Sequence, residues 1–291
     1  MYRVLRPFEY FEPTTVAEVA DILSKHNGKA KVLAGGMDLV PKMRRRDLSL
    51  EYLISLQRVK GLDYVNGDGK TGLKIGALAS LRSVELCPTV ARDYISLYEA
   101  IHQIASVQVK ANGTLVGNLC VATPASDVAT ALMALGATLK VAGTGRVKEV
   151  PIEDFFTEPG QTVMATNEIV TEVSVPKVLP GTGGAFLNLT KVKADIAKVS
   201  ATVVMTITND VCQTAKIALG AVAPTPLRCY QAEALLIGQK LELIDSELVA
   251  QRAADSCKPI TDVRSEAEYR KDMARVLTRR AIERALERTK S

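Results

Sequence analysis

The sequence contains no tryptophan and only two histidines, His26 and His102, among its 291 residues. Two histidines are too few for a histidine-rich metal site, and each is expected at the surface or at a helix end. The five cysteines, at positions 87, 120, 212, 229 and 257, are widely spaced and form no CxxC pair. Because iron–sulfur clusters and structural zinc sites use closely spaced cysteines, we expect no metal site here, only free thiols in a reducing compartment.

Long apolar runs and a strong charge of one sign are also missing. No stretch reaches the roughly 18 apolar residues of a membrane-spanning helix, and residues 1–15 lack the apolar core of a signal peptide. The net charge is only +5, and acids interrupt both basic segments, residues 42–47 and 270–290. A solvated face is therefore favoured over nucleic-acid binding, with a contact surface for an acidic partner as the alternative. We predict a cytoplasmic protein.

The chain does contain enough apolar residues, 47%, and enough length for two compact domains. Residues 14–26 carry apolar side chains at helical spacing, with a threonine cap before them and Asn27–Gly28 after them. Strand-like runs follow at 30–34 and 52–56. The beginning of the chain thus predicts a small β–α–β unit.

The pattern of expected secondary structure changes near residue 176, where a Pro/Gly-rich linker begins. Before it, the patterns predict alternating strands and helices, namely strands at 73–80 and 168–176, helices at 92–105 and 126–136, a turn at 66–72 and a hairpin over 137–151. After it come three β-like runs, at 185–193, 197–207 and 214–224, typical of an antiparallel sheet. Helices are expected at 233–239, 245–257 and 265–290, the last with an apolar stripe of Tyr269, Met273, Val276, Leu277, Ile282 and Leu286.

Two glycine-rich segments could hold a ligand. Gly35 and Gly36 follow a strand, and residues 113–118, GTLVGN, form a second polar turn. Glycine permits a positive φ and close approach of the backbone, and successive amides can form an anion site. Neither segment is the GxGxxG or P-loop motif, and most double-glycine turns bind nothing. Asp127, ahead of an alanine-rich helix, is either an acceptor for sugar hydroxyls or a plain helix-start acid.

Five segments in order along the chain resemble the FAD-binding medium subunits of the molybdenum hydroxylases, the family of xanthine dehydrogenase and carbon monoxide dehydrogenase. They are AGGMD at Ala34–Asp38, TLVGN at Thr114–Asn118, PASD at Pro124–Asp127, KVKADIAK at Lys191–Lys198 and GAVAPTPLR at Gly220–Arg228. Five matched segments are far more specific than either glycine turn alone.

The resemblance implies an α+β fold like that of the vanillyl-alcohol-oxidase (PCMH) type, in which two lobes grip an extended FAD. For this chain it implies an FAD-binding domain over residues 1–176, with lobes at about 1–57 and 58–176. A C-terminal domain with an antiparallel sheet and helices would occupy residues 177–291.

The resemblance also implies which residues contact FAD, with one glycine turn holding the pyrophosphate from each lobe. The implied contacts are Lys31, Val32, Leu33, Ala34, Gly35, Gly36, Met37, Asp38, Ile104, Thr114, Leu115, Val116, Gly117, Asn118, Asp127, Ile169 and Lys191. Met37 replaces a family threonine or histidine, and Val116 replaces a glycine. Because a β-branched residue adopts a positive φ with difficulty, Val116 is expected to displace FAD if the turn requires that geometry.

By the same resemblance, the chain is an oxidoreductase subunit with no catalytic acid, base or metal of its own. Electrons would come from the [2Fe-2S] clusters of a small partner subunit, after oxidation of the substrate at a molybdopterin-binding large subunit. The FAD would pass them to NAD or another acceptor, under a lid formed by Lys191–Lys198. Two alternatives stay open: an assembly subunit that has lost FAD, and a stand-alone flavin reductase similar to the enolpyruvyl reductases of cell-wall synthesis.

Overall fold

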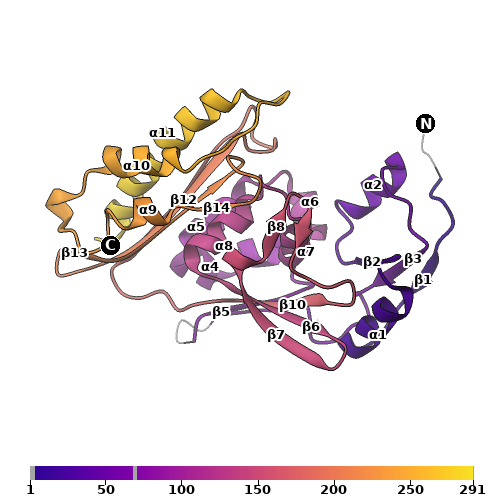
Figure 1. Cartoon of the computed structure of the whole chain (residues 1–291). Coiled ribbons are helices and arrows are strands. Elements are labelled where there is room, and N and C mark those ends of the chain that lie inside the picture. Colours follow the sequence, from indigo (N-terminus) through magenta and orange to yellow (C-terminus); the bar gives the residue numbers. More distant parts are fainter. Residues whose placement is uncertain (1–3, 68–70, 291) are drawn as a thin grey trace.

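The structure, a computed structural model, describes residues 4–67 and 71–290. Its elements form three parts that follow one another along the chain and in space (Figure 1). An N-terminal part lies at one end, a middle part of sheet and helices lies at the centre, and a C-terminal sheet with two long helices lies at the other end. Among the described residues, no helix is both long enough and apolar enough to cross a bilayer.

The N-terminal part is a three-stranded parallel sheet in the order β1-β3-β2. Its elements are β1 (Glu9–Phe11), α1 (Val16–His26), β2 (Ala30–Leu33), α2 (Leu39–Arg45) and β3 (Tyr52–Ser55). Thr15 caps α1 by accepting a hydrogen bond from the Glu18 amide, and Asn27 ends the helix in a left-handed conformation. The predicted helix and both predicted strands are confirmed, whereas β1 and α2 were not predicted.

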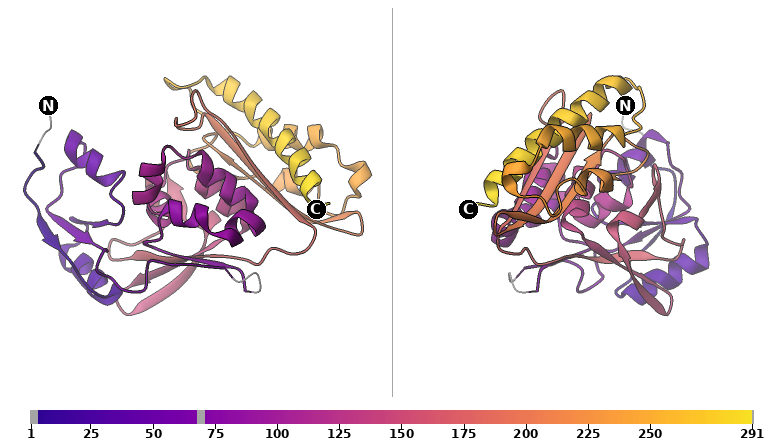
Figure 2. Two further views of the ribbon diagram at one scale, coloured as in Figure 1. Left: turned by 180° about the vertical axis from the view of Figure 1, so that it is seen from behind. Right: turned by 60° about the vertical axis from the view of Figure 1, so that its left-hand side comes forward.

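The middle part is a five-stranded antiparallel sheet in the order β4-β5-β10-β6-β7, with helices above one face (Figure 2). The strands are β4 (Val65–Gly67), β5 (Leu73–Gly76), β6 (Thr138–Gly143), β7 (Arg146–Pro151) and β10 (Ile169–Val175). The helices are α3 (Leu81–Leu86), α4 (Pro88–Asp93), α5 (Ile95–Gln103), α6 (Val107–Asn112), α7 (Leu115–Cys120) and α8 (Asp127–Leu135). A short segment of η1 (Ile152–Asp154), β8 (Phe156–Glu158) and β9 (Gln161–Thr162) precedes β10.

Two predictions for the middle part are wrong. The helix expected at 92–105 is interrupted at Tyr94, whose backbone is non-helical (φ −120°, ψ 50°) and whose hydroxyl donates to the Pro176 carbonyl at 3.1 Å. The polar segment expected to be a turn at 113–118 instead enters a helix, α7, immediately after α6. The predicted turn at 66–72 includes residues 68–70, which lie outside the described residues.

The C-terminal part is a four-stranded antiparallel sheet in the order β11-β12-β13-β14, as the β-like runs predicted. Its strands are β11 (Thr182–Leu189), β12 (Val199–Thr208), β13 (Val211–Gly220) and β14 (Leu227–Arg228). They are followed by α9 (Tyr230–Glu233), η2 (Leu241–Leu243), α10 (Ser246–Asp255) and α11 (Ala267–Arg288). The middle helices α5 and α8 pack on one face of this sheet and α11 packs on the other.

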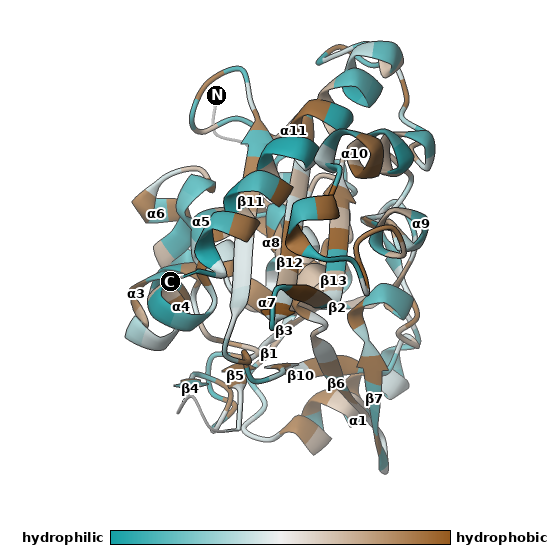
Figure 3. Ribbon diagram, turned by 90° about the vertical axis from the view of Figure 1, so that its left-hand side faces the viewer, coloured by the Kyte–Doolittle hydropathy of each residue, from teal (hydrophilic) through white to brown (hydrophobic). Residues whose placement is uncertain are grey.

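The sheet of the C-terminal part therefore separates two apolar cores. One core extends through the middle part into the N-terminal part and includes Phe186 and Ala218 from the C-terminal sheet, while the other lies beneath α10 and α11. A third, small cluster of Met43, Leu50 and Leu53 lies within the N-terminal part. Figure 3 shows α11 as mostly hydrophilic with short apolar patches. Its buried face is made largely of small residues such as Ala274 and Ala281, whereas Tyr269 is 44% exposed. The predicted stripe was wrong in including Tyr269.

Candidate functional site

The first glycine turn, Ala34–Asp38, connects β2 to α2 at the end of the parallel sheet. Gly36 has φ +72°, a conformation that favours glycine, and the Ala34 carbonyl accepts a hydrogen bond from Gln57 Nε2 at 3.1 Å. The five consecutive amides of residues 35–39 donate to no other described residue. Polar groups of a protein are normally paired, so this run of free donors is ready for solvent or for an anionic ligand.

The second glycine segment is the start of a short helix. Thr114 is the N-cap of α7, and its hydroxyl accepts a hydrogen bond from the Gly117 amide at 2.9 Å. Val116 lies within the helix, is 4% exposed and does not have a positive φ. Valine therefore fits here without backbone strain, and the condition under which Val116 was expected to displace FAD is not met in this structure.

The two glycine segments touch each other. A Cβ atom at Gly35 would lie 2.0 Å from the carbonyl oxygen of Asn112, and one at Gly113 would lie 3.5 Å from Met37 Cγ. Only a residue without a side chain fits at Gly35. The family resemblance predicted that both segments bind one ligand. In the structure they lie together at the junction of the N-terminal and middle parts.

Backbone hydrogen bonds to the segment before α3 hold the second glycine segment in place. The Leu81 amide donates to the Gly113 carbonyl at 2.8 Å, and the Leu115 amide donates to the Ala79 carbonyl at 3.1 Å. Gly113 and Thr114 are thus held against the start of α3, with α6 on one side and α7 on the other.

A buried ion cluster that the sequence analysis missed holds α6 in place. The Glu85 carboxylate, 4% exposed, accepts hydrogen bonds from Lys110 Nζ at 2.7 Å, from Arg82 at 2.7 Å and from His102 Nδ1 at 2.9 Å. Burial alone raises the pKa of Glu85, but these donors together hold it below its usual value. Only the i, i+3 spacing of Arg82 and Glu85 was visible in the sequence.

Asn118 contacts the N-cap of α8, the residue before Asp127. The Ser126 hydroxyl caps this helix by accepting from the Ala129 amide at 3.1 Å, and it donates to Asn118 Oδ1 at 2.6 Å. The side-chain oxygen of Asn118 is therefore engaged within the protein, and its amide nitrogen is the group left for a ligand.

Asp127 is the first residue of α8 and reaches the C-terminal sheet. Its Oδ2 accepts from Asn188 Nδ2 at 3.1 Å. Burial raises the pKa of Asp127 to about 7, against the opposing effect of the nearby amide of Asn188 and hydroxyl of Ser200. Its Oδ1 is buried without a hydrogen bond of acceptable geometry in the described part of the chain. The Ser200 hydroxyl, itself buried and unpaired, and a hydroxyl of a bound molecule are both able to supply the missing donor.

The remaining predicted contacts lie in several places. Lys31 is exposed on β2, and Val32 and Leu33 are half-buried beside it. Ile104 directly follows α5 and is partly buried, and Ile169, at the start of β10, is only 5% exposed within the apolar core. Lys191 is exposed in the loop between β11 and β12. A contact between these residues and FAD stays a prediction.

The donors at this junction and the acceptor at the start of α8 fit an FAD. Free main-chain amides at residues 35–39 suit a pyrophosphate, and the unpaired oxygen of Asp127 suits a sugar or ribityl hydroxyl. Within the described ranges, no group of three histidine, cysteine or acidic side chains could hold a metal ion.

Comparison with known proteins leads to the same conclusion for nearly the whole chain. Residues 6–178 match the family described as the FAD binding domain in molybdopterin dehydrogenase, and residues 185–285 match the CO dehydrogenase flavoprotein C-terminal domain. The carbon monoxide dehydrogenase medium chain of Hydrogenophaga pseudoflava is 32% identical, with 96% of each chain covered. The caffeine dehydrogenase subunit beta of Pseudomonas sp. strain CBB1 is 31% identical, over 97% of this chain and 95% of the relative.

The fold is similar to that of solved structures of the same family. The carbon monoxide dehydrogenase of Hydrogenophaga pseudoflava that lacks the Mo-pyranopterin moiety superposes with a TM-score of 0.92 at 33% identity, covering 98% of this chain and 99% of that one. The predicted α+β fold, with an FAD-binding domain followed by a C-terminal domain, is confirmed. The chain belongs to the FAD-binding medium subunits of the molybdenum hydroxylase family.

Proposed function

We propose that this subunit carries one FAD between the two glycine segments and transfers electrons from [2Fe-2S] clusters of a small partner subunit to NAD or another acceptor. The observation that carries the proposal is the run of free amides at residues 35–39, which lies against Gly113 at the start of the second segment. When bound, FAD supplies the exchange between one-electron and two-electron transfer.

The residues of the chain bind and orient the cofactor. The amides of Gly35–Asp38 donate to the pyrophosphate, and Thr114 and Asn118 approach it from α7. Asp127 accepts a hydroxyl through Oδ1, the atom that lacks a partner. The loop Lys191–Lys198 covers the flavin ring and places positive charge near it. No residue of this chain acts as acid or base on the organic substrate.

A division of the chain near residue 176 agrees with this role. We place the FAD-binding domain at residues 1–176 and the C-terminal domain at 177–291, which is supported by family matches that end at 178 and begin again at 185. The division falls between β10 and β11, which are joined by residues 176–181.

The proposed partners are a molybdopterin-binding large subunit and a [2Fe-2S] small subunit. Relatives named as a medium chain and as a subunit beta support a hetero-oligomer. These two relatives are named for carbon monoxide and for caffeine, yet they match this chain at 32% and 31% identity. Such equal similarity is expected if the substrate binds to another subunit.

The test is to purify the chain alone and together with its co-expressed partners. The isolated chain should show flavin absorbance and release one FAD per chain on denaturation, which an assembly subunit without FAD would not. With NADH it should reduce an artificial dye slowly, while oxidation of carbon monoxide, purines or aldehydes should require the complex. Robust oxidation of any of these by the isolated chain would overturn the proposal.

A further inference from the structure

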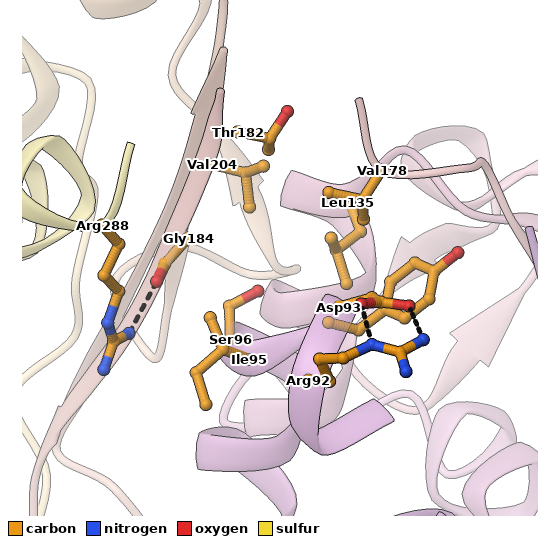
Figure 4. A pocket seen from close by; sticks show the side chains of 11 residues that line it. Arg92, Asp93, Ile95, Ser96, Leu135, Val178, Thr182, Gly184, Val204 and Arg288 are labelled. Atoms are coloured by element: carbon orange, nitrogen blue, oxygen red, sulfur yellow. Dashed lines mark hydrogen bonds and ion pairs between the residues drawn. The ribbon is translucent and has the colours of Figure 1, made fainter. Parts of the chain in front are cut away.

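A cavity of about 350 Å³ lies between the middle part and the C-terminal sheet. The first turn of α5 and the end of α8 form one side, and β11 with β12 forms the other (Figure 4). Small-molecule sites commonly have volumes of this order and lie where domains meet. The cavity is distinct from the proposed FAD site, because Asp127 and Leu135 lie at opposite ends of α8, about 12 Å apart at 1.5 Å per residue.

Ser96 supplies an unpaired hydroxyl to this cavity. The residue is 1% exposed, and its Oγ forms no hydrogen bond to any described residue. Figure 4 shows it between Gly184 of β11 and Leu135 of α8. A buried hydroxyl without a partner is unfavourable, so a polar group from outside the chain is expected beside it.

The start of α5 adds further donors around Ser96. The helix has no capping side chain and no acidic residue in its first turn. The amides of Ile95 and Ser96 donate to no other described residue. An uncapped helix start carries a partial positive charge, and here it coincides with the unpaired hydroxyl.

The charged residues around the cavity leave a positive balance. Arg92 binds Asp93 through two hydrogen bonds of 2.7 and 2.8 Å, so the carboxylate is neutralised. Arg288 binds Glu99 at 2.6 Å, and Arg284 lies 3.8 Å from the same carboxylate. Among the residues that line the cavity, two guanidinium groups thus stand against one carboxylate, and Glu99 pairs with Arg288 from outside the lining.

The remaining walls are apolar. Leu135, Val178 and Val204 line the cavity opposite the donors. Inorganic phosphate would satisfy the donors and leave these side chains uncovered, whereas a purely apolar molecule would leave Ser96 unpaired.

We propose that the cavity binds a small organic carboxylate, with its carboxylate group at Ser96 and the first turn of α5 and its apolar body against Leu135, Val178 and Val204. The ligand would contact both the middle part and the C-terminal sheet. The inference rests on the cavity itself and does not depend on the FAD proposal.

The test uses benzoate as the carboxylate probe, with benzamide as an uncharged molecule of the same shape and inorganic phosphate as an anion without an apolar body. Isothermal titration calorimetry on the full-length protein should show saturable binding of benzoate and at least about tenfold weaker binding of the other two. Ser96→Ala should weaken benzoate binding by about two- to tenfold, the equivalent of one hydrogen bond. Val204→Leu, which fills part of the cavity, should weaken it independently.

The matched control is Ser200→Ala. Ser200 is also a fully buried serine, but it lies near Asp127 and not in the cavity. The Ser200→Ala variant should bind benzoate with the affinity of the wild type. The proposal is overturned if benzoate does not bind, if benzamide binds equally well, or if Ser96→Ala and Val204→Leu both keep the wild-type affinity.

Discussion

Gly35 of the N-terminal part lies directly against the main-chain carbonyl of Asn112, so that a Cβ atom at Gly35 would stand 2.0 Å from that oxygen. In Gly35→Ala one of the two glycine segments must therefore move. We expect this variant to lose FAD, with affinity reduced at least about tenfold, or ~1.4 kcal/mol. Flavin content after gel filtration, relative to protein concentration, measures the effect.

Gly61→Ala is the control for this prediction. Gly61 has φ +76°, and no atom lies within 4 Å of the point that a Cβ atom would occupy, so alanine there strains the backbone without a clash. It should lower the free energy of unfolding by about 1 kcal/mol and leave flavin content unchanged. Full flavin retention by Gly35→Ala would refute the assignment of the pyrophosphate to this junction.

Asp127 should make the stability of the FAD-free protein depend on pH. Its pKa is raised from 3.8 to about 7 by burial, so between these values the folded protein keeps a proton that the unfolded chain has lost. The free energy of unfolding should then fall as pH rises from about 4 to about 7, by up to ~1.4 kcal/mol per pH unit. Asp127→Asn should remove this contribution, as measured by urea unfolding across the pH range.

The same variant tests the role of Asp127 toward FAD. An amide at this position keeps an acceptor oxygen but loses the negative charge, whereas Asp127→Ala removes both. Affinity for FAD should fall by roughly ten- to a hundredfold in Asp127→Ala, as for a buried hydrogen-bonded group, and less in Asp127→Asn. Unchanged affinity in both variants would return Asp127 to the role of a helix-start acid.

The sequence was sufficient for elements with strong local signals. The threonine and serine caps, the glycine or asparagine ends and the apolar periodicity of α1 and α8 predicted those helices closely. The antiparallel C-terminal sheet was equally readable from its β-branched runs. The five matched segments then indicated the family, because their order along the chain is preserved even where a single residue such as Val116 differs.

Features that depend on contacts between residues far apart in the chain could not be predicted from the sequence. The break at Tyr94 depends on a hydrogen bond to Pro176, and the ion cluster of Glu85 depends on three helices meeting. The short helix α7 looked like a turn because its glycine and asparagine have low helix propensity, which tertiary contacts override. On α11 the buried face includes Ala274, Ala281 and Ala285, which a stripe of large apolar residues did not include.

Lys110 should be needed for the position of α6. In Lys110→Met, Glu85 stays buried and loses the donor at 2.7 Å, while Arg82 and His102 remain. We expect a loss of about 1–3 kcal/mol in the free energy of unfolding and reduced FAD retention, because α6 carries Asn112 onto Gly35. Lys110→Arg keeps the charge and should restore both quantities, which separates the ion pair from simple packing.

The pH dependence of this cluster has the opposite sign to that of Asp127. The pKa of Glu85 is held below 4.5 in the folded protein, so its contribution to stability is present at neutral pH and is lost as pH falls through the folded pKa. Lys110→Met should reduce the acid-sensitive part of the wild-type unfolding curve. Identical acid unfolding of wild type and Lys110→Met would show that the pair does not stabilise the fold.

Replacing Ala105, between α5 and α6, by glycine should make the protein more stable. It has φ +36°, in the left-handed region where a Cβ atom is unfavourable by about 1–2 kcal/mol, and it is exposed, so glycine loses little packing. The greater flexibility of glycine in the unfolded chain offsets about 0.5–1 kcal/mol of this gain. We expect Ala105→Gly to raise the free energy of unfolding by about 0.5 kcal/mol in urea titrations. The control is Ala17→Gly, at an exposed position within the regular helix α1, which should instead lower the free energy of unfolding by about 1 kcal/mol. Changes of opposite sign in the two variants would identify Ala105 as left-handed in solution. Equal losses of stability in both variants would contradict that conformation.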